Sequence, residues 1–147
     1  MIAFQSSQTI QRPLSAVFAY WADPDNIPRW QGGVVSYRRD GDASQPVGVG
    51  TRYVIVRKAL GMQQETQGEY TAFEAERRIV EKVAAGPASY TIETRFTALG
   101  GQTRVDVDTR LELGGLMGRL GEKVAARPVK KQAAVDHARI KQILEQR

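Results

Sequence analysis

The sequence predicts an α+β fold in which one curved antiparallel sheet of about seven strands wraps around a long C-terminal helix. Three observations predict it. A strand-like segment opens the chain, six segments rich in Val, Ile, Thr, Tyr and Phe fill residues 34–113, and helical spacing returns from Leu116 onward. Short connections between consecutive strands favour antiparallel pairing. Such a sheet packed on a helix leaves a cavity between them.

The N-terminal segment divides into one strand and two short helices. Phe4–Gln11 lacks helical periodicity, which indicates a strand that ends before Pro13. Proline suits the first turn of a helix, and apolar residues recur at helical spacing over residues 14–21. A second short helix is expected over Pro24–Trp30, with Asp23 as its candidate N-cap.

The following strands are separated by clusters of turn residues. In the last two, apolar and polar residues alternate, so each strand buries one side and exposes the other. A bulge after Tyr70 would shift the alternation by one residue and send the wrong side chains inward. The expected strands are Val34–Asp40, Gly50–Leu60, Gln64–Glu74, Arg78–Ala85, Ser89–Ala98 and Thr103–Leu113.

The C-terminal helix carries apolar residues at three- and four-residue steps as far as Leu144. Gly118, Gly121 and Pro128 are poor residues for a helix interior. We therefore expect a kinked or irregular first half and a regular second half over Val129–Gln146.

Composition restricts the chemistry. The 147 residues have the size of one domain, so we expect a single domain over 1–147, present as a monomer or a homodimer. The N-terminus does not resemble a signal peptide, and no apolar run is long enough to span a membrane, so we expect a cytoplasmic protein. With no Cys and one His, disulfide, thiolate and zinc-cysteine chemistry are excluded, and we expect neither a metal nor a cofactor.

The net charge of +5 is concentrated at the C-terminus. Residues 1–114 hold 13 Lys and Arg against 13 Asp and Glu, whereas residues 115–147 hold 8 against 3. A basic helix can meet nucleic acid or an anionic membrane, although a solvated basic face is the commoner reason for such a pattern. The helix has no interleaved aromatic residues to stack on bases, which disfavours nucleic acid.

Several groups of residues form a pattern in a fixed order: Arg12–Phe18 with Ala22–Trp30, Val47–Tyr53, Phe73–Ile79, Gly100–Val105 and Asp136–Glu145. The pattern resembles the START-like, or Bet v 1-like, superfamily (SRPBCC), which includes polyketide cyclases/dehydrases and lipid-transport proteins. Ala75 and Glu76 replace prolines common at their turn, and His137 stands where an apolar residue is usual. The resemblance implies a helix-grip fold and a ligand-binding domain, but the superfamily spans carriers, cyclases and interaction modules.

Alternation places several polar groups on the cavity side of the sheet. An inward Arg57 and Glu81 could orient a carbonyl or enolate with a tyrosine as proton donor, although strand tyrosines more often serve as packing residues. His137 lies three residues from Ile140, on or near the apolar stripe of the helix, so we expect a packed or partly solvated histidine. A catalytic role would require it to face the cavity. The cavity candidates are Trp30, Tyr37, Tyr53, Arg57, Tyr70, Glu81, Tyr90, Thr94, Phe96, Thr109 and Leu120.

Three functions remain open on this evidence. The first is binding of a small hydrophobic or amphipathic ligand of the lipid, polyketide or aromatic class. The second is a polyketide cyclase or dehydratase that uses Arg57, Glu81 or a tyrosine. The third is an interaction module in which the basic C-terminal helix makes peripheral contact with a membrane or binds another partner.

Overall fold

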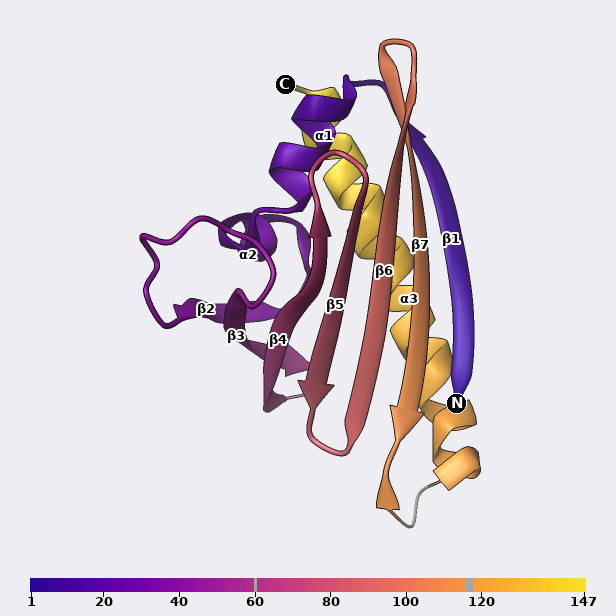
Figure 1. Cartoon of the computed structure of the whole chain (residues 1–147). Coiled ribbons are helices and arrows are strands. Elements are labelled where there is room, and N and C mark those ends of the chain that lie inside the picture. The colour runs from indigo at the N-terminus through magenta and orange to yellow at the C-terminus, as the bar shows by residue number, and fades with distance from the viewer. Residues whose placement is uncertain (60, 116–117) are drawn as a thin grey trace.

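The computed structural model describes residues 1–59, 61–115 and 118–147 (Figure 1). Its strands form one seven-stranded sheet in the order β1-β7-β6-β5-β4-β3-β2, and all neighbours are antiparallel. The elements are β1 (Ile2–Ile10), α1 (Leu14–Trp21), the 3-10 turn η1 (Pro24–Asn26), α2 (Ile27–Trp30), β2 (Val34–Asp40), β3 (Arg52–Ala59), β4 (Met62–Glu74), β5 (Arg78–Ala85), β6 (Ala88–Leu99), β7 (Gln102–Leu113) and α3 (Gly118–Glu145).

The long helix α3 crosses one face of the sheet, behind β6 and β7 in Figure 1, and packs against β1, β7 and α2. Strand β1 extends the sheet beyond the last strand of the meander by pairing with β7, from Ile2 opposite Leu111 to Ile10 opposite Thr103. The α+β helix-grip fold predicted from the sequence is therefore confirmed.

Most predicted boundaries lie within two residues of the observed ones. Strand β5 matches at both ends, and β1 begins two residues earlier than expected because its pairing with β7 continues to Ile2. The predicted N-cap is confirmed, since the Asp23 side chain accepts a hydrogen bond from the Asp25 N–H at 3.0 Å. The expected strand end at Leu60 and helix start at Leu116 lie outside the described residues.

We expect the first half of α3 to be kinked or locally irregular, and Gly118 at its start has a positive φ of 37°. The helix continues without a break from Gly118 through Pro128 to Glu145. Proline removes one N–H from the helical ladder. Pro128 is exposed. Water can therefore bind the backbone carbonyl that lacks an N–H partner because of the proline.

The bulge considered as a possibility after Tyr70 is present between Tyr70 and Ala72, where the pairing of β4 with β5 shifts by one residue. Because of this shift, Tyr70 and Phe73 both point to the side covered by α1 and α3, where their rings lie 5.7 Å apart. The bulge therefore keeps two large aromatic residues inside, three positions apart on one strand.

We call the face of the sheet that α1 and α3 cover the inner face. Its main core joins apolar residues of β5, β6 and β7 to those of the two helices. Burial of this surface contributes about 25 cal/mol per Å² and drives the helices onto the sheet. The fully or nearly fully buried members include Val17, Phe18, Ile79, Phe96, Val105, Val107, Ile140 and Leu144.

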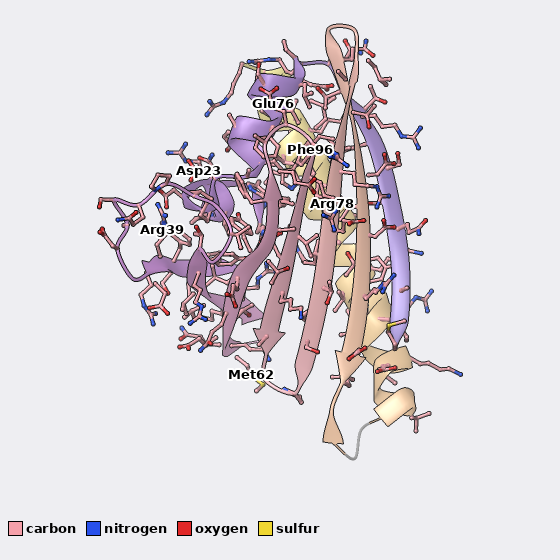
Figure 2. The ribbon with its side chains drawn as sticks, viewed as in Figure 1. Asp23, Arg39, Met62, Glu76, Arg78 and Phe96 are labelled. Carbon is pink, nitrogen blue, oxygen red and sulfur yellow. The ribbon has the colours of Figure 1, made fainter. Side chains whose placement is uncertain are left out.

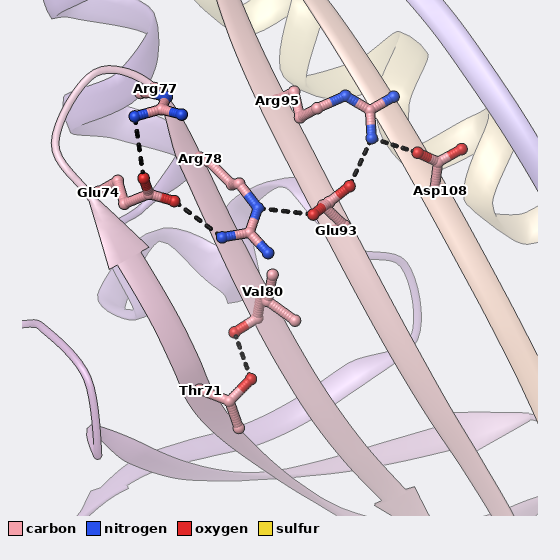
Figure 3. Close-up of polar contacts among 8 residues, drawn as sticks. All are labelled: Thr71, Glu74, Arg77, Arg78, Val80, Glu93, Arg95 and Asp108. Atoms are coloured by element: carbon pink, nitrogen blue, oxygen red, sulfur yellow. Dashed lines mark hydrogen bonds and ion pairs between the residues drawn. The ribbon is translucent and has the colours of Figure 1, made fainter.

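The opposite, outer face of the sheet carries a chain of ion pairs (Figure 3). The Arg78 guanidinium donates to Glu74 at 2.8 Å and to Glu93 at 2.6 Å. Arg95 then links Glu93 to Asp108 on β7. The labelled Arg78 lies in front of the sheet in Figure 2, on the side away from α3.

Candidate functional site

Alternation along β3, β4, β5 and β6 brings a small set of polar side chains onto the otherwise apolar inner face. Tyr53 lies directly opposite Gly68, which in turn lies opposite Val83. A Cβ atom at Gly68 would lie 2.2 Å from Tyr53 Cζ, so the missing side chain leaves the space that the Tyr53 ring occupies. The ring crosses β4 there and reaches Glu81 on β5.

Tyr53 and Glu81 form a hydrogen-bonded pair. The Tyr53 hydroxyl donates to Glu81 Oε1 at 2.7 Å. Burial raises the pKa of the Glu81 carboxyl, and the hydrogen bond from Tyr53 lowers it in part. Burial also raises the pKa of Tyr53, as does the nearby charge of Glu81. The pair thus holds a carboxyl group that protonates more readily than a solvated one.

Arg57 lies four residues after Tyr53 on β3 and faces the same side of the sheet. Its neighbours on the adjacent strands are Val34 on β2 and Gln64 on β4. Its Nη2 atom donates to the side-chain oxygen of Gln31, which follows α2. Its Nε atom is buried and has no hydrogen-bond partner among the described residues. A buried N–H of a charged group without a partner costs free energy, so this atom is a free donor inside the site.

The segment that follows α2 connects Arg57 to α3 through hydrogen bonds. The Gly32 N–H donates to Asp136 Oδ1 at 2.9 Å, and the Gln132 side chain donates to the same oxygen at 2.8 Å. Burial raises the pKa of Asp136, while these hydrogen bonds and the charge of Arg57 lower it in part. Asp136 therefore fixes the segment that carries Gln31, the partner of Arg57.

Trp30 and His137 pack together where α2 meets α3. The ring centroids of Trp21 and Trp30 lie 5.4 Å apart, and His137 lies 5.6 Å from Trp21 and 6.4 Å from Trp30. Burial lowers the pKa of His137 to about 4, so the imidazole is neutral at pH 7. The expectation that His137 packs on the apolar stripe is met, and Trp30 is a buried wall residue whose Nε1 has no described partner.

Two other predicted tyrosines point inward with their hydroxyl groups already engaged. The Tyr37 hydroxyl donates to Asp25 Oδ1 at 2.6 Å, and burial followed by this contact raises the pKa of Tyr37. The Tyr70 hydroxyl donates to the Ala22 carbonyl at 3.3 Å. Their placement supports the packing role that the sequence left open.

The remaining candidates divide into inner-face residues and one outlier. Tyr90 is half-buried, whereas Thr94, Phe96 and Thr109 are buried. Leu120 was expected to line the cavity from the helix, yet its side chain is 79% exposed. The reason is that α3 packs through Asp136, Ile140 and Leu144 farther along, which turns the Leu120 side away from the sheet.

Arg57 and Glu81, the two inward residues expected to orient a ligand together, have separate hydrogen-bond partners. Among the described residues, Arg57 bonds to Gln31 and Glu81 bonds to Tyr53. Sequence reasoning missed Gln31 and Asp136. A weak signal existed for Asp136, because it is one of three acidic residues in the basic segment 115–147.

A separate hollow of about 450 Å³ opens on the outer face of the sheet. Its side chains are mostly polar and of both charges, among them Arg52, Glu69, Lys82 and Glu112. Arg52 and Glu69 are already within 3.6 Å of each other. This hollow lacks the apolar lining typical of a small-molecule site.

The sequence of residues 1–145 matches the family described as polyketide cyclase/dehydrase and lipid transport. The chain belongs to this family. The match spans all the strands and the whole of α3, and therefore every residue of the candidate site. A comparison of the sequence with curated proteins finds no match.

Solved structures share the fold of this family member at low sequence identity. Ara h 8.0201 superposes with a TM-score of 0.80 at 13% identity, covering 99% of both chains. TTHA0849 from Thermus thermophilus gives 0.78 at 18% identity over 97% of both chains. The ZhuI aromatase/cyclase from Streptomyces sp. R1128 gives 0.78 at 14% identity, covering 99% of this chain and 94% of the other. These likenesses establish the fold alone.

Within the described residues, no helix is long and apolar enough to cross a membrane.

Proposed function

We propose that this protein binds a small hydrophobic or amphipathic ligand, of the lipid, polyketide or aromatic class, against the inner face of the sheet. The observation that carries the proposal is the buried Nε–H of Arg57, which has no partner among the described residues although it lies on a mostly apolar face. Small-molecule sites typically combine apolar walls with a few such placed polar groups.

The proposed ligand has two parts that match two parts of the face. A carbonyl, carboxylate or phenol oxygen would accept the hydrogen bond from Arg57 Nε, which removes the cost of an unpaired buried donor. The apolar remainder would pack on half-buried residues such as Ile92, Val83 and Tyr90. Each Å² of apolar surface removed from water contributes about 25 cal/mol to binding before the costs of association.

The test is a thermal-shift and native mass-spectrometry screen against lipids, sterols, quinones and aromatic polyketides. For any ligand found, Arg57→Met should weaken binding by roughly 10–100-fold, the range expected for a lost hydrogen bond to a charged group. Arg52→Met is the matched control, because Arg52 lies on the same strand but faces outward. Absence of binding across all four classes, or equal loss in both variants, would contradict the proposal.

The pair of Glu81 and Tyr53 favours a second function, that of a cyclase or dehydratase. A carboxyl group with a raised pKa can act as base and then as acid. In a dehydration, the Glu81 carboxylate would take the proton next to a carbonyl and return it to the departing hydroxyl, which leaves as water. Arg57 would stabilise the enolate oxygen meanwhile.

This second function predicts that Glu81→Gln abolishes turnover of a poly-β-ketone substrate while folding and ligand affinity are retained. Turnover and affinity are separate readouts, so binding without turnover in the wild-type protein would leave the first function standing and remove the second. Glu112→Gln, at an exposed outer-face position, serves as the control for the loss of one negative charge.

A further inference from the structure

The first half of α3 exposes apolar and basic side chains together, on the side of the helix away from the sheet. Leu120 and Val124 are 79% and 75% exposed, which is unusual for large apolar residues of a packed helix. Arg127 and Lys131 follow at steps of three and four residues and are also exposed. We call Leu120, Val124, Arg127 and Lys131 the α3 stripe, with Lys123 and Lys130 at its border.

Among the described residues of this half, no acidic group offsets the charge on the exposed side. Glu122 and Asp136 lie on the opposite side of the helix and are 6% and 5% exposed. Glu122 binds the N-terminal amino group at 2.5 Å and the Leu113 N–H at 3.1 Å, while Asp136 binds Gly32. In the part of the chain that the structure describes, Lys123, Arg127, Lys130 and Lys131 form no ion pair.

We infer that the α3 stripe docks on an anionic lipid bilayer surface. Four cations without described ion-pair partners complement negatively charged headgroups, and two exposed apolar side chains beside them can enter the boundary between headgroups and acyl chains. Single-stranded nucleic acid fits less well, because α3 contains no aromatic residue on which a base could stack.

A further exposed apolar residue, outside α3, lies at the same end of the molecule. Met62, at the start of β4, is 74% exposed, and Figure 2 places it at the lower end of the sheet, the end at which α3 begins in Figure 1. The hairpin between β6 and β7, which contains Leu99, lies at the opposite end. Docking through the α3 stripe would therefore bring the Met62 end toward the bilayer and leave the Leu99 end in water.

Vesicle co-sedimentation tests the charge requirement. The full chain should bind phosphatidylcholine vesicles that contain phosphatidylserine, release them at high ionic strength, and show little binding to phosphatidylcholine alone. Lys123→Gln with Arg127→Gln should weaken binding to the anionic vesicles by about 25-fold, since each cation near such a surface contributes about a factor of five. Lys82→Gln with Arg110→Gln changes the net charge equally on the outer face and should have far less effect.

Insertion is tested separately with a dye. Because the chain has no cysteine, Leu120→Cys provides a single attachment point for an environment-sensitive fluorophore, and Leu99→Cys provides the control at the opposite end. Emission from position 120 should shift to shorter wavelength with anionic vesicles, whereas that from position 99 should not. Both positions are exposed, so the variants should keep the circular dichroism spectrum of the wild-type protein.

Several results would overturn the proposal. Equal losses in the two double variants would show attraction by net charge alone. Equal shifts at positions 120 and 99 would show no defined docking face. Absence of binding to anionic vesicles at low ionic strength, or binding to single-stranded polyuridine in preference to these vesicles, would likewise rule out a membrane-docking stripe. None of these results bears on ligand binding at the inner face.

Discussion

Charged side chains have different partners on the two faces of the sheet. On the outer face, Glu74, Arg78, Glu93, Arg95 and Asp108 form one chain of ion pairs, so each charge has a charged neighbour. On the inner face, charged groups are few and are bound to neutral side chains, and one donor has no described partner. The comparison indicates that the outer charges stabilise one another, whereas the inner charges depend on neutral partners.

The same difference appears in the carboxyl groups. Hydrogen bonding to Arg78 lowers the pKa of Glu93, whereas burial raises the pKa of Glu81. Ionised carboxylates are therefore favoured outside and disfavoured inside. The two groups should affect stability with opposite dependence on pH.

The largest effect is expected for a methyl group added to the inner face at Gly68. Gly68→Ala forces the buried Tyr53 ring out of its place and should destabilise the fold by roughly 2–3 kcal/mol, a typical cost of overpacking. Gly101→Ala is the control, because nothing lies within 4 Å of a Cβ atom there. Urea unfolding measures both, and equal stability of the two variants would show that Gly68 is not needed for the path of Tyr53.

An intermediate effect is expected for Glu81→Gln. Folding raises the pKa of Glu81 above its ordinary 4.5. The resulting contribution of Glu81 to the free energy of unfolding is therefore fully present below the unfolded-state pKa, and it is lost as the pH rises through the folded-state pKa. The glutamine variant does not undergo this loss. It should match the wild-type protein at low pH and exceed its stability by roughly 1–2 kcal/mol at neutral pH, the scale on which neutral replacements of buried charges stabilise proteins.

The measurement is the difference in free energy of unfolding between Glu81→Gln and wild type across a pH series, since contributions of other groups cancel in the difference. A difference that does not change with pH would mean that Glu81 behaves as a solvated carboxylate, which contradicts its place in the site.

The smallest effect is expected on the outer face. Folding lowers the pKa of Glu93, so its contribution is present above the ordinary value of 4.5 and is lost as the pH falls through the folded pKa. Glu93→Gln should therefore cost less than about 1 kcal/mol at neutral pH, because the pairs are partly exposed and screened by water. Added salt should reduce this cost further; an effect larger than that of Glu81→Gln would reverse the comparison between the faces.

Much of the inner face could be predicted from the sequence. Alternation in the strands placed Tyr53, Arg57 and Glu81 on one side, and a bulge after Tyr70 was considered only as a feature that could reverse this assignment. This succeeded because the period of a strand is two, so a few apolar residues fix the side on which every other residue lies.

The partners of these residues could not be predicted. The bond between Tyr53 and Glu81 spans 28 positions and depends on the absence of a side chain at Gly68, on the strand between them. The bond between Arg57 and Gln31 depends on how α2 is held by Asp136 of α3. Such contacts follow from tertiary packing, which strand periodicity does not contain.

The misplacement of Leu120 has a similar cause. Helical spacing put Leu120 among the apolar residues of α3, but spacing does not say which turns of a helix reach the sheet. The contacts of α3 are with β1, β7 and α2, and its first turns leave Leu120 and Val124 exposed.

The central claim is that a ligand binds at the inner face through Arg57, and nuclear magnetic resonance of arginine side chains tests it most directly. On addition of a ligand from the screen, the Nε–H signal of Arg57 should move, while those of Arg78 and Arg95 in the outer ion pairs should stay in place. A ligand that binds and leaves the Arg57 signal unchanged, or moves only the outer signals, would contradict the claim.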